Sequence, residues 1–276
     1  MTVKQNYSVL MSVYHADQPD WLRLSIESIL NQTIPTDDFV IVCDGPLSEG
    51  LNQVLNEYSE INSCIHIFRL QKNVGLGNAL AFGIKCCKNE LIARMDADDI
   101  SLKNRAQIQL KLHKNGNYDV VGGEILEFMD NPKHPTGIRS VPECANKARD
   151  FYIYRNPLNH VSVMFKKSSV LRAGNYQDMP YREDYFLWIR MLEKGAKLYN
   201  IQKPLVLVRA GDAMYKRRAG KRMLSSCISL AKYMKNGGFL TNFEYIKVLV
   251  MWIGGATLPT KVRKKIYKKS FRHGLS

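Results

Sequence analysis

The sequence lacks the cysteine patterns that stabilise small secreted domains or hold structural metal ions. Its 276 residues include six cysteines, none in a Cys-x-x-Cys pair and none with histidine at ligand spacing. Several of them fall inside apolar runs, where cysteine packs as a small hydrophobic side chain. This usage is typical of a reducing compartment and argues against a disulfide framework.

Long hydrophobic runs are also missing. The longest uncharged stretch, Val248 to Thr260, is well below the roughly 20 apolar residues that a membrane-spanning helix needs. The N-terminus does not resemble a signal peptide. The run from Tyr7 to Tyr14 is short and strand-like, and it has neither a basic leader nor a small-residue cleavage site. We therefore expect no transmembrane helix, no secretory leader and a cytoplasmic location.

Acidic residues are almost absent from the last quarter of the chain. Up to Gln202 the chain carries 23 basic and 23 acidic residues, whereas 203–276 holds 17 basic residues against Asp212 and Glu244. The whole net charge of +15 therefore lies in this segment. Such an excess can indicate nucleic acid or an anionic membrane as a partner, and its position confines that question to the C-terminal part.

Strands and helices alternate through the first part of the chain. Apolar runs at 7–13, 39–42, 64–70 and 91–95 predict buried strands, and residues at helical spacing between them predict helices. This α/β pattern favours a mostly parallel sheet with helices on both faces and ligands at the carboxyl ends of the strands. After Pro142 the pattern is less regular, and we interpret it as a second half-domain. Its predicted elements are a helix at 183–194 and strands at 161–165 and 205–209.

Three carboxylates stand within four residues at the end of the fourth predicted strand: Asp96, Asp98 and Asp99. They repel one another unless a cation neutralises them, and hard oxygen ligands favour Mg²⁺ or Mn²⁺. Such an ion can bridge to a diphosphate and stabilise it as a leaving group. The alternative is a solvated acidic turn in which Asp99 or Ser101 caps the next helix.

Two other strand ends carry candidate ligands for a nucleotide. Asp44 follows the second strand, where a short carboxylate can accept a hydrogen bond from the N3–H of uracil. The segment Asn73–Gly77 offers backbone amides and a helix N-terminus to an anion. Each segment, taken alone, is also explained by an ordinary tight turn.

A further helix is predicted to begin at Glu183 and Asp184, beside an aromatic-rich sequence. Both acids lie in the first turn, where the helix dipole favours negative charge. As a functional residue, Asp184 would be a general base within reach of an acceptor hydroxyl. The alternative is a helix start with favourable charges and no further role.

Together these segments resemble the family 2 glycosyltransferases of GT-A fold. One departure is Cys43, where many relatives carry an acid, and the absence of a QxxRW motif argues against a processive synthase. The resemblance covers about residues 7–218 and is greatest to bacterial enzymes of the amylovoran and O-antigen type. Its motifs, in chain order, are Ser8–Tyr14, Ser25–Thr33, Cys43–Leu47, Asn73–Ala79, Asp96–Asp99, Arg155–His160, Glu183–Asp184 and Arg217–Gly220.

The resemblance implies a GT-A, Rossmann-like catalytic domain over 1–220, with a nucleotide-binding half at about 1–120 and an acceptor half at about 121–220. It implies Asp184 as the catalytic base and a metal, Mn²⁺ or Mg²⁺, held by Asp96 and Asp98. The donor-binding residues would be Val13, Tyr14, Asp44, Asn73, Gly75, Asp96 and Asp98. Asp99 and Glu183 would support them, and basic character makes Arg209, Arg217 and Arg218 candidate diphosphate contacts.

The segment 221–276 is expected to form a helical, basic, membrane-associating tail. Thr260–Arg272 carries seven basic residues, each worth ~1 kcal/mol near an anionic lipid surface. The alternatives are a solvated helix packed on the catalytic domain and a nucleic-acid arm. Aromatic residues are not interleaved with the basic ones, so no nucleic acid is expected. An apolar stripe precedes this cluster, with Trp252 as an interfacial aromatic: Phe243, Ile246, Leu249, Val250 and Ile253.

Our first hypothesis is an inverting transferase that moves galactose or glucose from a UDP-sugar donor to a GlcNAc-diphospho-undecaprenol-type acceptor, with a β-linked product. It would serve O-antigen or exopolysaccharide assembly as a peripheral protein on the cytoplasmic face of the bacterial inner membrane. The second hypothesis, a sugar nucleotidyltransferase, is disfavoured because Tyr14–Pro19 lacks the basic residues of its glycine loop. The third, a non-catalytic nucleic-acid-binding protein, is disfavoured by the central acidic cluster.

Overall fold

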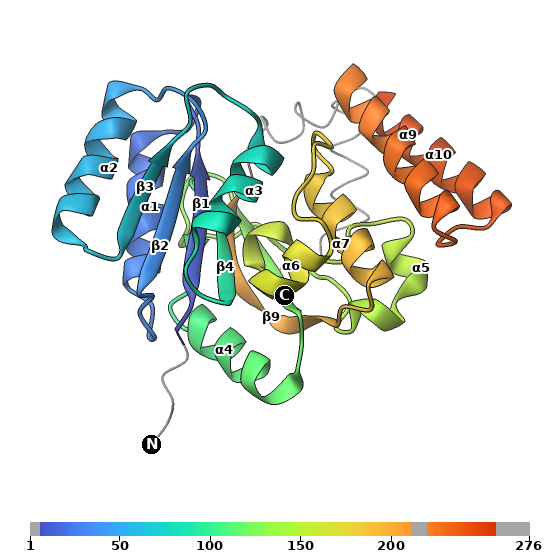
Figure 1. Ribbon diagram of the computed structural model, residues 1–276, viewed down its shortest axis with the longest axis horizontal. Helices are drawn as coiled ribbons and strands as arrows, with labels where there is room; N and C mark the ends of the chain where they lie inside the picture. The colour runs from blue at the N-terminus through green and yellow to red at the C-terminus, as the bar shows by residue number, and fades with distance from the viewer. Residues whose placement is uncertain (1–5, 211–219, 258–276) are drawn as a thin grey trace.

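A single mixed β-sheet is the framework of the protein (Figure 1). The computed structural model describes residues 6–210 and 220–257. The strands are β1 (Ser8–Val13), β2 (Asp38–Cys43), β3 (Ile65–Arg69), β4 (Leu91–Asp96), β5 (Ile100–Ser101), β6 (Val120–Phe128), β7 (Gly137–Arg139), β8 (Met164–Lys166) and β9 (Leu198–Arg209). Within these ranges the sheet has nine strands in the order β3-β2-β1-β4-β8-β6-β9-β5, with β7 paired to β6.

The first four strands run parallel, as the alternation of strands and helices predicts. Val13 of β1 lies opposite Cys43 of β2, and Ser12 lies opposite Asp96 of β4, so the carboxyl ends of these strands meet at one edge. Beyond β4 the sheet is mixed, because β8 is antiparallel to both β4 and β6 while β6 and β9 are parallel. The two halves expected from the sequence therefore share one sheet.

Helices cover both faces of the sheet, which confirms the predicted architecture. In β1, Val9 and Met11 pack on one face with α1, α2 and α4, whereas Leu10 packs on the other with α3, α6 and α7. The helices are α1 (Pro19–Leu30), α2 (Glu49–Ile61), α3 (Leu76–Cys86), α4 (Arg105–Gly116), α5 (Arg149–Tyr152), α6 (Lys167–Arg172), α7 (Glu183–Glu193), α9 (Lys221–Asn236) and α10 (Asn242–Thr257).

A third apolar cluster joins α7 to a hairpin of helices, α9 and α10, which lie side by side at one end of the molecule (Figure 1). Arg149 of α5 forms an ion pair with Glu244 of α10 at 2.7 Å and donates to the carbonyl oxygen of Phe239. The hairpin is therefore fixed to α5 and α7 by apolar packing and by charge. Residues 258–276, which include the whole predicted basic cluster Thr260–Arg272, lie outside the described residues.

Trp252 does not face a membrane, contrary to the prediction. Its side chain is 5% exposed, packs edge-on against Tyr185 and donates its Nε1–H to the carbonyl oxygen of Tyr154 at 2.9 Å. The rest of the stripe splits by helical face, since Leu249 and Ile253 are partly buried whereas the other apolar side chains point outward. The exposed fractions are 71% for Phe243, 60% for Ile246 and 68% for Val250.

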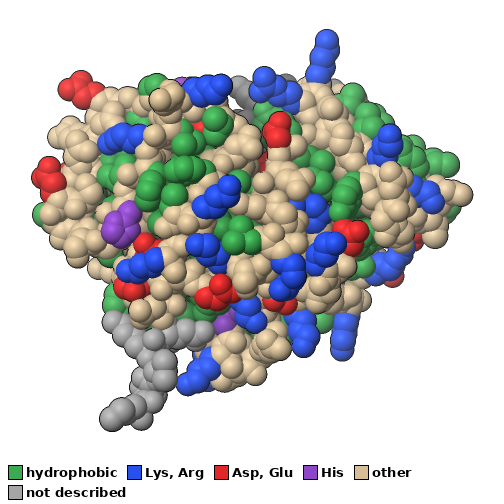
Figure 2. Space-filling model, in the orientation of Figure 1, with side chains coloured by type: hydrophobic (Ala, Val, Ile, Leu, Met, Phe, Trp, Pro, Cys, Tyr) green, Lys and Arg blue, Asp and Glu red, His purple; other side chains and the backbone are tan. Residues whose placement is uncertain are grey.

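The outward face of the hairpin is visible as hydrophobic surface at the right-hand edge of Figure 2. Within residues 6–210 and 220–257, no helix has the length and apolar character needed to cross a bilayer.

Two local predictions were wrong. The strand expected at 161–165 begins only at Met164, because His160–Ser162 forms a 3₁₀ turn in which Ser162 N–H donates to the carbonyl oxygen of Asn159. Helix α4 is preceded by Asn104 rather than by Asp99 or Ser101. The capping explanation of the acidic cluster is therefore excluded.

Close packing of α3 on the sheet generates a stability prediction. A Cβ atom at Gly83 would lie 2.4 Å from Leu10 Cδ1 and 2.9 Å from Val42 Cγ2. We expect Gly83→Ala to lower the free energy of unfolding by about 1–3 kcal/mol, because overpacking outweighs the better helix propensity of alanine. The measurement is thermal or urea unfolding.

Gly254 of α10 is the matched control, because it is also inside a helix and a Cβ there meets no atom within 4 Å. Gly254→Ala should be neutral or stabilising by up to about 1 kcal/mol. Stabilisation by both substitutions would contradict the close approach of α3 to the sheet.

Candidate active site

A large cleft, with a volume of about 1640 Å³, opens at the carboxyl ends of β1, β2 and β4. The wall that faces these strand ends comes from the start of α7 and from the α9–α10 hairpin. The side chain of Val13 is buried in the core instead, and Arg217 and Arg218 lie outside the described residues. The predicted site residues that line the cleft are Tyr14, Asp44, Asn73, Gly75, Asp96, Asp98, Asp99, Glu183, Asp184 and Arg209.

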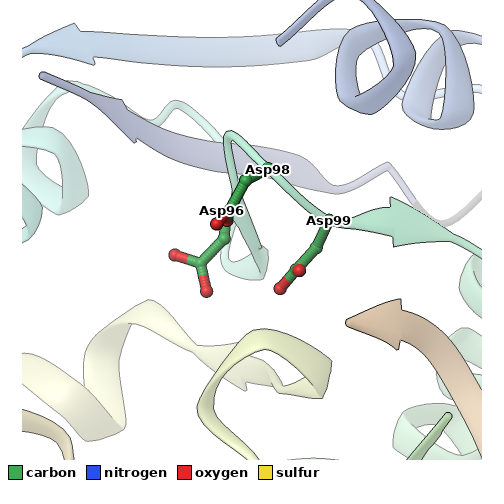
Figure 3. A group of neighbouring side chains, drawn as sticks. All are labelled: Asp96, Asp98 and Asp99. Atoms are coloured by element: carbon green, nitrogen blue, oxygen red, sulfur yellow. The ribbon is translucent and has the colours of Figure 1, made fainter. Parts of the chain in front are cut away.

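The acidic trio of Asp96, Asp98 and Asp99 lies where β4 turns toward β5. Each contributes a carboxylate oxygen, and these oxygens lie within 4.8 Å of one another (Figure 3). Burial raises the pKa of Asp99 well above its usual range, and the charges of Asp98 and Asp96 raise it further. A compact group of hard oxygen donors with unfavourable mutual repulsion fits Mg²⁺ or Mn²⁺.

A buried arginine, Arg94, lies in β4 just before this trio. Both terminal nitrogens of Arg94 pair with the carboxylate of Asp96. Its charge also acts to lower the pKa values of Asp99, Glu183 and Asp184, against the effect of burial. Arg94 was not among the predicted site residues, although a cation inside an otherwise apolar strand is itself a signal.

Asp184 occupies a position suited to a base. Its carboxylate accepts hydrogen bonds from Asn156 Nδ2 at 2.5 Å and from the backbone N–H of Tyr185 at 2.7 Å. Burial raises the pKa of Asp184, and burial together with the charge of Asp184 raises the pKa of Glu183 to about 7. A carboxylate whose pKa is raised by burial is a stronger base, and it can take a proton from a bound hydroxyl.

Asp44 organises the loop before α3. Its buried carboxylate accepts from the backbone N–H of Val74 at 2.7 Å and of Gly75 at 3.1 Å, and its carbonyl oxygen accepts from Asn73 Nδ2. The backbone amides of Val74 and Gly75, which were predicted to bind an anion, therefore donate to the carboxylate of Asp44. Tyr14 also lines the cleft, and the contact of Asp44 with the uracil base of a nucleotide stays a prediction.

Arg209 belongs to the same side of the cleft as the acidic trio. Its backbone N–H donates to Asp99 Oδ1 at 2.8 Å. Its guanidinium lies 4.4 Å from the ring centroid of Trp21 and 4.7 Å from that of Phe128. The two rings hold the cation at the rim of the cleft.

Asn156 and His160 are site residues to which sequence analysis assigned no role, although both lie in a motif that carries the family resemblance. His160 Nε2 hydrogen-bonds with the hydroxyl of Tyr176 at 2.7 Å, and its ring packs edge-on against Trp188. Burial and the nearby charge of Arg94 lower the pKa of His160 well below its usual value. His160 is therefore a neutral neighbour of Arg94, and Asn156 orients Asp184.

Comparison with known sequences identifies the family. Residues 8–177 match the model of glycosyl transferase family 2. The chain is 34% identical over 268 residues to the amylovoran biosynthesis glycosyltransferase AmsE of Erwinia amylovora, covering 95% of this chain and 98% of that protein. It is 34% identical over 270 residues, 98% of each chain, to the UDP-Gal:alpha-D-GlcNAc-diphosphoundecaprenol beta-1,3-galactosyltransferase of Escherichia coli. The chain therefore belongs to glycosyltransferase family 2.

Solved structures of similar fold confirm the architecture. S. aureus TarS 1-349 in complex with UDP-GlcNAc matches with a TM-score of 0.69 and 14% identity, over 96% of this chain and 76% of that one. The mannosyltransferase PcManGT from Pyrobaculum calidifontis in complex with GDP-Man and Mn²⁺ matches with a TM-score of 0.67 and 13% identity, over 98% and 76%. The chain is a GT-A glycosyltransferase. The two alternatives raised from the sequence, a sugar nucleotidyltransferase and a non-catalytic nucleic-acid-binding protein, are therefore not supported.

The raised pKa of Glu183 generates a pH prediction. Its folded-state pKa is about 7, against ~4.3 for an ordinary glutamate, so folding favours the protonated form. The contribution to stability is present at acid pH and is lost as the pH rises through about 7. Glu183→Gln should therefore be more stable than the wild type at about pH 8, by about 1–3 kcal/mol.

Thermal unfolding of both proteins between about pH 4.5 and pH 8 measures this difference, which should vanish at the acid end. A stability difference that is the same at both ends of the range would contradict a carboxyl group that resists ionisation.

Proposed function

We propose that the chain transfers galactose or glucose from a UDP-sugar to a GlcNAc-diphospho-undecaprenol-type acceptor with inversion, in O-antigen or exopolysaccharide assembly. The observation that carries the proposal is the position of the acidic trio and of Asp184 on opposite walls of one cleft. The similarity to a β-1,3-galactosyltransferase named for a lipid-linked GlcNAc supports the donor and the acceptor.

On the donor side, Asp96 and Asp98 would hold Mn²⁺ or Mg²⁺, with Asp99 behind them. The ion would neutralise charge on the diphosphate that leaves with the uridine. Asp44, Tyr14 and the loop from Asn73 to Gly75 would bind the nucleoside. Arg209 would contact the donor diphosphate from the same rim, since it already lies against Asp99.

On the acceptor side, Asp184 removes the proton from the attacking hydroxyl. The hydroxyl oxygen forms the new bond to the anomeric carbon as the bond to the donor diphosphate breaks, and the proton stays on the carboxyl group. A single displacement of this kind turns an α-linked donor into a β-linked product. Asn156 holds the carboxylate in position, and Arg94 favours its ionised form.

A lipid-linked acceptor requires the enzyme to work at a membrane. We propose peripheral binding to the cytoplasmic face of the bacterial inner membrane. The outward apolar side chains of α10 and the basic composition of 258–276 support this proposal, because stable anchoring combines both signals.

The proposed base makes a direct prediction. Asp184→Asn should lower kcat by about 10²–10⁴-fold, because the amide cannot take the proton, while UDP binding is retained. Glu193→Gln, an acid-to-amide change at the other end of α7, should leave kcat unchanged. Turnover is measured by product formation from UDP-galactose and UDP-glucose, and the anomeric configuration by NMR. Wild-type turnover by Asp184→Asn, or an α-linked product, would sink the assignment.

Metal dependence is tested separately. Chelation by EDTA should lower turnover by about 10²-fold or more, and added Mn²⁺ or Mg²⁺ should restore it. Asp98→Asn should need a higher metal concentration for half-maximal rate, whereas Asp150→Asn, an acid of α5 away from the trio, should not. Full activity of the chelated enzyme would contradict a metal-assisted reaction.

A further inference from the structure

The α9–α10 hairpin forms a wall of the catalytic cleft on the side of Asp184. The hairpin lies against α7, the helix that begins at Glu183 and Asp184 (Figure 1). Two features of this wall remain unexplained by donor binding or by the base, namely its cations and its apolar side chains. The hairpin residues that line the cleft include Arg222, Met223, Ser226, Met251 and Trp252.

Arg182 is the inner cation of this wall. It precedes Asp184 by two residues, and its guanidinium lies 4.3 Å from the ring centroid of Trp252 and 5.7 Å from that of Tyr185. One terminal nitrogen contacts the sulfur of Cys227 at 3.3 Å, and the buried Nε has no hydrogen-bond partner. Among residues 6–210 and 220–257, no carboxylate forms an ion pair with Arg182. Its charge is therefore available to a bound anion.

Arg222 is the outer cation. It stands one helical turn before Ser226 on α9, and both residues line the cleft. Arg222 is exposed and forms no ion pair with the described carboxylates. The opposite wall differs, because there Arg94 is already paired with Asp96.

Apolar side chains accompany these cations on the hairpin. Met223, Met251 and Trp252 line the cleft, Met251 is also 44% exposed, and Val250 and Ile246 are exposed on the outward face of the same helix. The hairpin thus offers two cations without an ion-pair partner together with apolar side chains both in the cleft and on the surface. A ligand with an anionic group near its head and a long hydrocarbon tail matches both features.

We propose that Arg182, Arg222 and the apolar side chains of the hairpin bind the diphosphate and the first isoprene units of a polyprenyl-linked acceptor, with its terminal sugar at Asp184. The inference rests on the proposed function, in which the acceptor is a lipid-linked sugar. It assigns the two diphosphates of the reaction to opposite walls of the cleft, with the donor's beside Asp96 and Asp98. Arg209 belongs with the donor, because it contacts Asp99.

Equilibrium binding to the full chain tests the proposal. The probe is synthetic GlcNAcα-diphospho-undecyl, and UDP with Mn²⁺ is present at saturation so that the donor site is filled. Arg182→Gln and Arg222→Gln should each raise the Kd of the probe by about 10-fold or more, because each removes a charge-assisted contact. The Kd of GlcNAcα-undecyl, which lacks the diphosphate, should be unchanged by either substitution.

Lys232→Gln is the matched control, since it removes a positive charge from the exposed face of α9 outside the cleft, and it should not change either Kd. Arg182→Gln also alters packing at Trp252, so the decisive variant is the exposed Arg222→Gln. An unchanged Kd for that variant, displacement of the probe by UDP, or no binding by the wild type would overturn the proposal. Arginine-dependent binding without sugar transfer from any UDP-hexose would instead refute the proposed function.

Discussion

The ion pair between Arg94 and Asp96 is the interaction on which the catalytic cleft depends. A lone guanidinium buried in β4 would cost several kcal/mol, and Asp96 offsets that cost at the strand end where the acidic trio begins. The carbonyl oxygen of Asp96 accepts from Ser25 Oγ at 2.7 Å, which ties this strand end to α1. The same cation favours ionisation of Glu183 and Asp184 across the cleft. One buried charge thus acts both on the acidic trio and on the proposed base.

Four of the arginines that line the cleft divide into two groups around this pair. Arg94 is paired with Asp96, and Arg209 is anchored at Asp99 and held between aromatic rings, so the donor wall keeps a net excess of carboxylates that suits a divalent ion. Arg182 and Arg222 form no ion pair with the described carboxylates, so the hairpin wall carries two cations that are not neutralised by a direct partner. In the proposed reaction, the two diphosphates would therefore occupy different places in one cleft.

Helix α10 has apolar side chains on both its buried face and its outward face. For this reason only part of its packing was predicted correctly from the sequence. Trp252 and Val248 belong to the face that packs on the catalytic half, whereas Phe243, Ile246 and Val250 belong to the outward face. Helical spacing shows that an apolar helix has faces, but it carries no information about which neighbour covers each face. Trp252 was therefore assigned to the membrane, although it stacks on Arg182 beside the proposed base.

The sequence by itself determined the parallel strands and the acids at their ends, because apolar runs that alternate with helical periods specify a parallel sheet, and its carboxyl ends meet at one edge. Asp44 and Asp96 were located in this way, and α7 was predicted from its first acidic turn. Only the tertiary structure decided that Asp184 faces the acidic trio, that Asn156 orients it and that Trp252 turns inward. These relations join segments that are far apart in the chain, and local propensity cannot encode the packing that brings them together.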